Sequence, residues 1–408
     1  MSGRLSTMRL VVVVLAVFVA ACGADPSVEA VGPQSGAVAE PPPWRQLDAP
    51  PLAARSGAAI GWTGEEIVVV GGSTFVCPPG ADCPAPIEPP FRDGAALHPA
   101  TGDWRPIADA PVPVSPHQRT AQLGGHVYVL VKPWDDGLRP GATLLRYRPD
   151  TDAWASYEVP TDAYVGGLLA AGTGLVVYPG SDESGETPDL WFDPMTEAWS
   201  ELPEDPLNPS FDRLYAWNDD GLHLFAKDIT PSPGGASGPA LVNAAVLVDG
   251  AWRELPTGET LGFWAVISDA DRIVAPALGC ADGGQVNNFG RCIPHGAVFN
   301  THTGTWAELP DAPSRGDKDV HSSGAFTADE VLLASVGHHM LDLTTDSWLR
   351  MPDIDDENDG ATVQRTFAGA GPYGFAFGGA RFEENDFTGE LLGDAWLWTS
   401  PTRDGSTR

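Results

Sequence analysis

The stretch FDPMTEAW, residues 192–199, contains a short apolar segment, a turn, and a tryptophan that opens a second segment. The same order of residues returns at residues 97–104, 147–154, 299–306 and 341–348, and residues 249–252 are a shortened copy. In the five full copies a threonine lies three residues before the tryptophan. A fixed offset that recurs about every 40–60 residues is typical of a fold built from repeated units, each of which packs against its neighbours.

The composition favours strands over helices. The 408 residues include 47 glycines and 39 prolines, and 42% are hydrophobic, which is enough for a packed core. Such a chain suits many short strands joined by turns. After residue 22 no apolar stripe recurs at helical spacing between capping residues. We therefore expect an all-β fold.

Each repeat contains four strand signals. In the first repeat they are residues 55–62, 66–72, 93–98 and 104–107, where apolar and β-branched residues lie between glycine and proline clusters. The second of these strands recurs at residues 126–131, 174–178, 221–226, 272–277, 330–335 and 373–379. The sequence therefore contains seven such units.

The tryptophan that marks the fourth strand is missing from the last unit. It occurs as Trp104, Trp154, Trp199, Trp252, Trp306 and Trp348. The seventh unit ends at residues 394–399, but Trp44 begins a matching segment before the first unit. A sheet without its outer strand has an open edge. We predict a seven-bladed β-propeller of four-stranded blades, in which the N-terminal strand completes the blade of Trp398. Six or eight blades, or a stacked β-solenoid, are the alternatives.

The pattern resembles the kelch repeat, over about residues 44–399. The glycine doublet that follows the second kelch strand is matched by Gly71 and Gly72 and by Gly378 and Gly379. Residues 132–133 and 179–180 depart from the doublet. The resemblance implies a β-propeller like the central domain of the galactose oxidases. It says little about function, because one fold can support many functions.

The N-terminus has the features of an export signal. Arg4 and Arg9 precede the apolar run of residues 10–19, which is too short to form a stable membrane span. The sequence Val-Ala-Ala-Cys that ends at Cys22 resembles the lipobox of bacterial lipoproteins. The resemblance implies cleavage before Cys22 and attachment of a diacylglyceryl group to its sulfur. The alternative is an ordinary secretory signal cut near Ala21.

These features divide the chain into four parts. We expect a signal peptide at residues 1–21, the lipidated Cys22 and a flexible tether at residues 22–43, the propeller at residues 44–400, and a tail at residues 401–408. The expected location is the extracytoplasmic face of the cell membrane. The formal net charge of −32 disfavours nucleic acid and anionic lipid as partners. We expect a monomer that contacts the membrane through its lipid anchor alone.

The remaining cysteines form two local pairs, Cys77 with Cys83 and Cys280 with Cys292. Two local disulfides are the simplest of the three possible connectivities, and they agree with an exported protein. A metal site is the alternative, but no CxxC motif or Cys/His cluster supports it. We predict no metal ligands among these residues. With all four cysteines paired, the cysteine cross-link of the galactose oxidases has no counterpart.

In the predicted propeller, the connections between the second and third strands share one face with the connections between blades. Four of these connections are long, at residues 73–92, 227–243, 279–295 and 380–393. Variable loops on a rigid scaffold are the usual place for binding. We therefore expect a protein or carbohydrate partner on this face, called the loop face below.

Basic and aromatic residues recur near the starts of the first strands, at the mouth of the central channel. The candidate ligand-binding residues there are Arg55, His117, Arg119, Tyr164, Arg213, Trp264, His321 and Arg365. Guanidinium groups bind carboxylates in a two-pronged geometry, so converging arginines could hold a sugar acid. The alternative is structural, with each arginine paired to carboxylates or carbonyls.

No catalytic constellation stands out. We find no nucleophile elbow, phosphate-binding glycine loop or HExxH motif, and we predict no cofactor. The acidic run at residues 353–360 offers oxygen ligands for calcium, but its spacing does not match an EF-hand, and a solvated linker is the interpretation we favour. The leading hypothesis is a binding module. The alternative is an enzyme on a sugar acid, similar to the kelch-type sialic-acid mutarotases.

Overall fold

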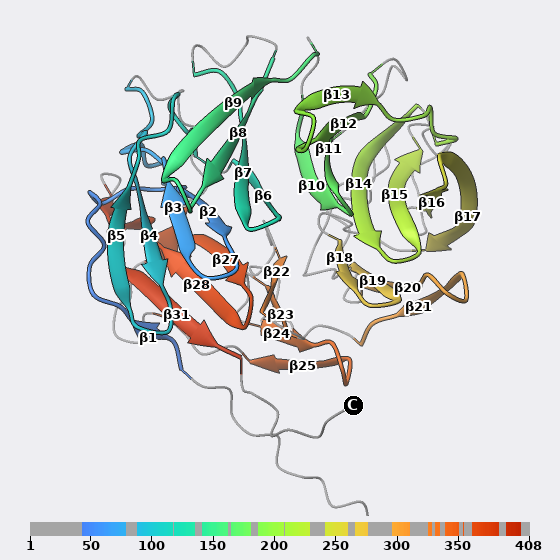
Figure 1. Cartoon of the computed structure of the whole chain (residues 1–408). Helices are drawn as coiled ribbons and strands as arrows, with labels where there is room; N and C mark the ends of the chain where they lie inside the picture. The colour runs from blue at the N-terminus through green and yellow to red at the C-terminus, as the bar shows by residue number, and fades with distance from the viewer. Residues whose placement is uncertain are drawn as a thin grey trace, which may run out of the picture. The chain divides into compact units, whose positions relative to one another are not determined.

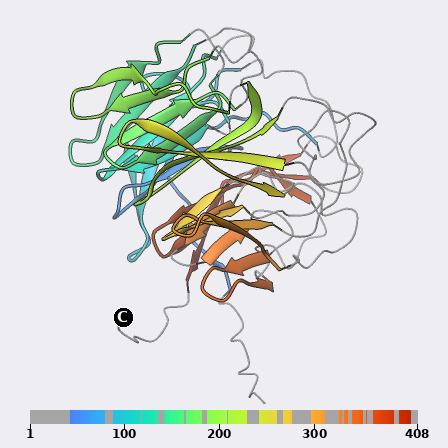
Figure 2. The ribbon, with the colours of Figure 1, turned by 90° about the vertical axis from the view of Figure 1, so that its right-hand side faces the viewer.

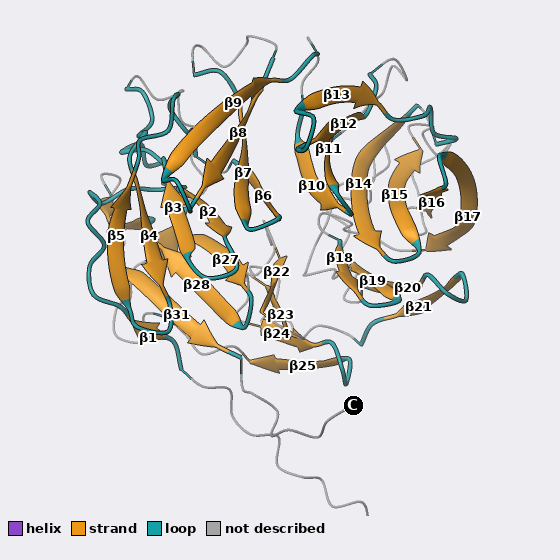
Figure 3. Ribbon diagram, viewed as in Figure 1, coloured by secondary structure: helices purple, strands orange, loops and turns teal. Residues whose placement is uncertain are grey.

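The structure of the protein is a computed structural model. It describes residues 43–78, 88–116, 118–134, 141–161, 165–180, 187–207, 209–228, 241–259, 266–275, 296–310, 325–328, 331–334, 339–350, 354, 361–382 and 389–400. The chain divides into two compact units, Met1–Glu40 and Pro41–Arg408, and every described residue belongs to the second. Strands, loops and turns form the described part, which contains no helix (Figure 3).

The described strands form seven four-stranded antiparallel sheets, which we number as blades 1 to 7. Blade 1 contains β2 (Ala59–Trp62), β3 (Ile67–Val70), β4 (Gly94–His98) and β5 (Asp103–Ile107). Blade 2 contains β6 (Arg119–Leu123), β7 (His126–Val131), β8 (Thr143–Arg148) and β9 (Ala153–Glu158). Blade 3 contains β10 (Gly167–Ala171), β11 (Gly174–Tyr178), β12 (Leu190–Asp193) and β13 (Ala198–Glu201).

The longest strands belong to blade 4, which contains β14 (Ser210–Asn218), β15 (Gly221–Asp228), β16 (Leu241–Val248) and β17 (Ala251–Glu259). Figure 2 shows them as long yellow-green ribbons. Blade 5 contains β18 (Ile267–Asp269), β19 (Arg272–Ala275), β20 (Ala297–Asn300) and β21 (Thr305–Glu308). Blade 6 contains β22 (Ala325–Ala328), β23 (Val331–Ala334), β24 (His339–Asp342) and β25 (Ser347–Arg350).

Blade 7 combines strands from the two ends of the described chain. Its order is β1 (Arg45–Gln46), β31 (Ala395–Thr399), β28 (Tyr373–Phe377) and β27 (Thr366–Ala370). Arg45 pairs with Leu397 and Gln46 with Trp396 (Figure 1). The predicted closure by the N-terminal strand is therefore confirmed. A small additional sheet, made of β26 (Ala361–Val363), β29 (Ala380–Phe382) and β30 (Glu390–Leu391), lies in the connections of the same blade.

The blades follow one another in a ring. The first strand of each blade, which we call strand a, contacts strand a of the next blade, from β2 through β6, β10, β14, β18, β22 and β27 and back to β2. The other strands b, c and d follow outward in each sheet. The protein is thus a seven-bladed β-propeller, as the sequence predicted. One end of the propeller is the loop face, and we call the other end, with the a–b and c–d turns, the turn face.

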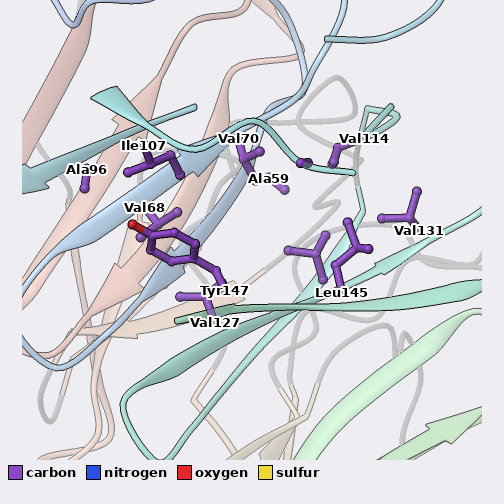
Figure 4. Close-up of a cluster of buried hydrophobic side chains, with 12 residues drawn as sticks. Ala59, Val68, Val70, Ala96, Ile107, Val114, Val127, Val131, Leu145 and Tyr147 are labelled. Carbon is purple, nitrogen blue, oxygen red and sulfur yellow. The ribbon is translucent and has the colours of Figure 1, made fainter. Parts of the chain in front are cut away.

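The core lies between blades, because the strands b whose burial is described, such as β3, are covered on both sides. In β3, Val68 and Val70 pack toward blade 2 (Figure 4), whereas Ile67 and Val69 pack toward blade 7. This alternation follows from the two-residue period of a strand, and it explains the continuous apolar run. The described buried residues form seven apolar clusters, one at each contact between neighbouring blades.

In five blades the tryptophan of strand d joins the blade to the one before it. Five indole N–H groups, those of Trp104, Trp154, Trp252, Trp306 and Trp348, donate to a backbone carbonyl at 2.7–3.1 Å. The acceptor is always the residue four positions after the tryptophan of the preceding blade, as Ala108 is for Trp154. The repeated tryptophan therefore sets the spacing between blades as well as filling the core.

The residue two positions before the strand-d tryptophan has a positive φ in the six c–d turns, with φ between 46° and 82°. It is a glycine in three of them, and in the other three it is Asp152, Glu197 or Asp346. These three acidic residues form ion pairs with Arg105, Arg146 and Arg272 of the preceding blades. On the turn face, ion pairs thus link blade 1 to 2, blade 2 to 3, and blade 5 to 6.

Candidate functional site

Arg55 holds the two ends of the b–c loop in blade 1. Its side chain is fully buried, and it donates from Nη1 and Nη2 to the two carboxylate oxygens of Asp93 at 2.7 and 2.9 Å. It also donates to the carbonyl oxygens of Gly71, at 3.2 Å, and Ala53, at 2.9 Å. Gly71 directly follows strand b and Asp93 directly precedes strand c, so one guanidinium group contacts both ends of the loop. These hydrogen bonds hold the pKa of Asp93 below its usual value.

Two further contacts order this root. The guanidinium of Arg55 lies 4.2 Å from the ring centre of Phe91, in a cation–π contact. The Ser56 hydroxyl donates to the Phe75 carbonyl at 2.7 Å, which fixes the first part of the loop. Gly71 has a φ of 71°, and a Cβ on it would lie 2.3 Å from Cβ of Val114, in the connection between blades 1 and 2. The glycine is therefore required where the loop leaves the sheet.

Arg365 has the same role in blade 7. Its Nη1 and Nη2 both donate to Oδ2 of Asp394 at 3.1 Å, and the indole of Trp396 donates to the same oxygen. Asp394 directly precedes β31. The arginine side chain is almost fully buried. A second guanidinium–carboxylate pair thus lies where strand c begins.

The roots of blades 7 and 1 are also joined to each other through the backbone of Arg55. Its amide donates to the Leu392 carbonyl at 3.1 Å, and its carbonyl accepts from the Gly379 amide at 3.0 Å. Gly378, with a φ of 64°, could not carry a side chain, because a Cβ would lie 2.3 Å from the Arg55 carbonyl oxygen. The glycine doublets therefore let the root of one loop lie against the next blade.

Arg213 connects blade 4 to the root of the loop in blade 3. Its Nη2 donates to Oδ2 of Asp189 at 2.8 Å and to Oδ2 of Asp205 at 2.7 Å, and its Nη1 donates to the Ser210 hydroxyl at 2.7 Å. Its backbone amide donates to the Gly180 carbonyl at 2.8 Å. Asp189 directly precedes strand c of blade 3. This third root is thus held from the neighbouring blade.

The cluster around Arg213 is buried and carries two carboxylates for one guanidinium. The Tyr215 hydroxyl donates to Oδ2 of Asp189 as well. Burial raises the pKa of Asp189 despite the nearby Arg213, and it raises the pKa of Tyr215 further above its ordinary value. A buried charge is tolerated only with such partners, so this cluster is a fixed structural element.

Arg119 differs from the other three arginines. It is exposed, and its Nε donates to the Gly166 carbonyl at 3.1 Å. In the described part of the chain this is the one hydrogen bond of the Arg119 side chain. Arg119 is the first residue of β6, whereas Arg55 lies four residues before β2, so the four arginines do not share one strand position. Three of the four arginines thus fit the structural alternative, since each is paired with a carboxylate at a loop root, and Arg119 is exposed.

The remaining candidates lie outside the described residues. These are His117, Tyr164, Trp264 and His321 at the channel mouth, Cys22, Cys83, Cys280 and Cys292, and all of the acidic run 353–360 except Ile354. Cys77 is described, and it is disulfide-bonded. Its pairing with Cys83 stays a prediction.

The described residues offer neither a metal-ligand cluster nor a membrane-spanning helix. They contain no group of three or more His, Cys, Asp or Glu residues placed to hold a metal ion. Over that same portion of the chain, no helix has the length and apolar character needed to cross a membrane.

Sequence analysis identified the arginines but missed their partners. Asp93, Asp189 and Asp394 share one feature, since each directly precedes strand c. That feature is visible in the sequence once strand c is placed. Which carboxylate each arginine pairs with could not be predicted, because the separation in sequence differs among the three pairs, at 38, 29 and 24 residues.

Neither the family models nor the curated proteins contain a match to this chain.

Proposed function

We propose that the protein is a lipid-anchored, extracytoplasmic propeller of the kelch type, which binds a ligand or a protein partner through its loop face. The observation that carries the proposal is the set of arginine–aspartate pairs at the loop roots. Buried guanidinium groups hold the carboxylates of Asp93, Asp189 and Asp394, so the b–c loops of blades 1, 3 and 7 leave the sheet at fixed points. The loops of blades 1 and 7 are among the long ones. Rigid roots below long, variable loops are what a binding surface needs, because less order has to be gained on binding.

The anchor is tested at Cys22. The wild-type protein should fractionate with membranes, and the mass of its N-terminal peptide should include a diacylglyceryl group. Cys22→Ser should move the protein to the soluble fraction. A wild-type N-terminal peptide that begins after Ala21 without lipid would overturn this part of the proposal.

The binding face is tested with two photo-crosslinking positions in blade 3. Glu204 is exposed on the loop face beside Asp205, whereas Met195 is 88% exposed in the c–d turn on the turn face. With the crosslinker at Glu204, illumination of intact cells should give an adduct of defined mass that is absent with the crosslinker at Met195. Adducts from Met195 alone would place the partner on the turn face and contradict the proposal.

One observation favours a second candidate, an enzyme that acts on a sugar acid. The exposed guanidinium of Arg119 remains available to a carboxylate at the channel mouth. Thermal-shift measurements with sialic and glucuronic acids test this candidate. A rise in melting temperature that disappears in Arg119→Ala supports it, and the absence of any shift leaves the binding module as the better account.

A further inference from the structure

The chain enters the propeller in a fixed direction. Arg45 lies opposite Leu397, Gln46 lies opposite Trp396, and the Leu47 amide donates to the Ala395 carbonyl at 2.9 Å. Strand β1 therefore advances toward the start of β31, and Trp44 lies at the level of the end of β31. Figure 1 shows β1 beside β31.

The two ends of β31 belong to opposite faces of the propeller. Its start follows Asp394, which Arg365 holds at a loop root. Its end, Thr399, lies opposite Tyr373, and the Ser400 amide donates to the Pro372 carbonyl at 2.8 Å. Pro372 belongs to the a–b turn of blade 7, so this end lies on the turn face. Trp44 accordingly enters the propeller on the turn face.

We propose that the anchored protein carries its turn face toward the membrane and its loop face away from it. The inference rests on the proposed lipidation of Cys22. The expected tether lies outside the described residues up to residue 42. A coil of about 20 residues has a root-mean-square reach of roughly 25 Å. The strands add to this distance, because strands of four to nine residues, such as β13 and β17, extend roughly 13–30 Å between the two faces.

This orientation defines the kind of partner. A partner of the loop face would be a molecule of the extracytoplasmic space that approaches from the side opposite the bilayer. The lipid surface itself would face the c–d turns. The net charge of −32 disfavours direct binding of the body of the protein to anionic lipid, so the anchor rather than the protein surface would hold it at the membrane.

Energy transfer to the membrane tests the orientation. A fluorophore is attached to a cysteine introduced by Met195→Cys or by Glu204→Cys in the full-length, lipidated protein on vesicles that contain acceptor-labelled headgroups. Both positions belong to blade 3, and strand β13 lies between them. We expect about twofold more transfer from residue 195 than from residue 204, because the loop face lies one strand length farther from the lipid. Equal transfer, or more from residue 204, would overturn the inference.

A second arm separates this inference from the question of lipidation. Residues 1–22 are replaced by a hexahistidine segment, and the protein is held on vesicles with nickel-chelating lipids. The same excess of transfer from residue 195 supports the orientation even if Cys22 proves to be unmodified. Equal transfer in this arm overturns the orientation even if the lipid anchor is present.

Discussion

Arg272 of blade 5 donates from one nitrogen, Nη1, to both carboxylate oxygens of Asp346 in blade 6, at 2.9 and 3.1 Å. Asp346 makes this contact from a backbone with a φ of 49°, a region that L-residues rarely adopt. The ion pair therefore coexists with a strained turn. Three other c–d turns place a glycine at the same position and have no strain of this kind.

The first prediction separates the strain from the ion pair. Asp346→Gly loses the pair but relieves the backbone, so its stability should stay close to that of the wild type. Asp346→Ala loses the pair and keeps the strain, and it should be less stable than Asp346→Gly by about 1–2 kcal/mol. Urea denaturation midpoints provide the measurement.

The matched control is Gly304→Ala in blade 5. Gly304 occupies the same repeat position with a φ of 68°, and a Cβ there would meet no atom within 4 Å. Its loss of stability therefore reports the strain alone. If the alanine and glycine variants at residue 346 unfold at the same urea concentration, the strain is not the deciding factor.

The second prediction concerns the loop roots. Arg55→Ala leaves the Gly71 and Ala53 carbonyls without a donor and removes the partner of Asp93, so it should destabilise the protein by on the order of 3 kcal/mol. Hydrogen exchange of the Gly71 and Phe91 amides should become faster. Both amides are hydrogen-bonded within the root.

Arg119→Ala is the control for that experiment. Its side chain is exposed and makes one described hydrogen bond, so the variant should unfold within about 0.5 kcal/mol of the wild type. Equal losses in the two variants would show that the guanidinium at Arg55 has no special role in the root.

The third prediction concerns closure of the ring. A chain that begins at residue 44 keeps β1 and should remain a stable monomer. A chain that begins at residue 48 exposes the edge of β31 and should melt at a lower temperature and form oligomers. Differential scanning fluorimetry and light scattering after size-exclusion chromatography would show this. Identical melting temperatures for the two chains would mean that β1 adds nothing to blade 7.

The fourth prediction is a pH dependence from His223. This side chain is buried against Phe225 and Phe299, and burial lowers its pKa from 6.5 to about 4. The unfolded chain takes up a proton near pH 6.5, whereas the folded protein takes it up only near pH 4. Stability is therefore complete above pH 6.5 and falls as the pH decreases toward 4, by on the order of 3 kcal/mol.

The variant His223→Phe should have a flatter dependence over that range. The fields of Asp220 and Arg253 act on His223 in opposite directions, and they remain in the variant. The measurement is the free energy of unfolding at several pH values between 7 and 4.5. Parallel curves for the two proteins would contradict a buried, neutral histidine.

The strands could be predicted because their signals are local. Residues 67–70 are four consecutive β-branched residues, and every one is buried between two blades. The tryptophan positions also revealed that the N-terminal strand belongs to blade 7, because Trp44 marks the strand d that the seventh unit lacks. In a repeat the same signal recurs from unit to unit, so the assignment of one strand supports that of the others.

The candidate site was harder to predict, because its partners are distant in sequence. Arg55 and Asp93 are separated by 38 residues, and Arg213 and Asp189 come from different blades. Neither spacing recurs, so the arginines alone left both a ligand site and a structural pairing open. Burial distinguishes the structural arginines from the candidate ligand-binding one, since Arg55 and Arg213 are buried and Arg119 is exposed.

The pairing of β1 with β31 also sets the order of events during biosynthesis. The ribosome makes β1 before any other strand of the propeller and makes β31 last. Blade 7 cannot be completed, and the ring cannot close, until β31 has been synthesised. The slowest step of folding should accordingly follow chain completion, because it joins the two most distant segments of the propeller.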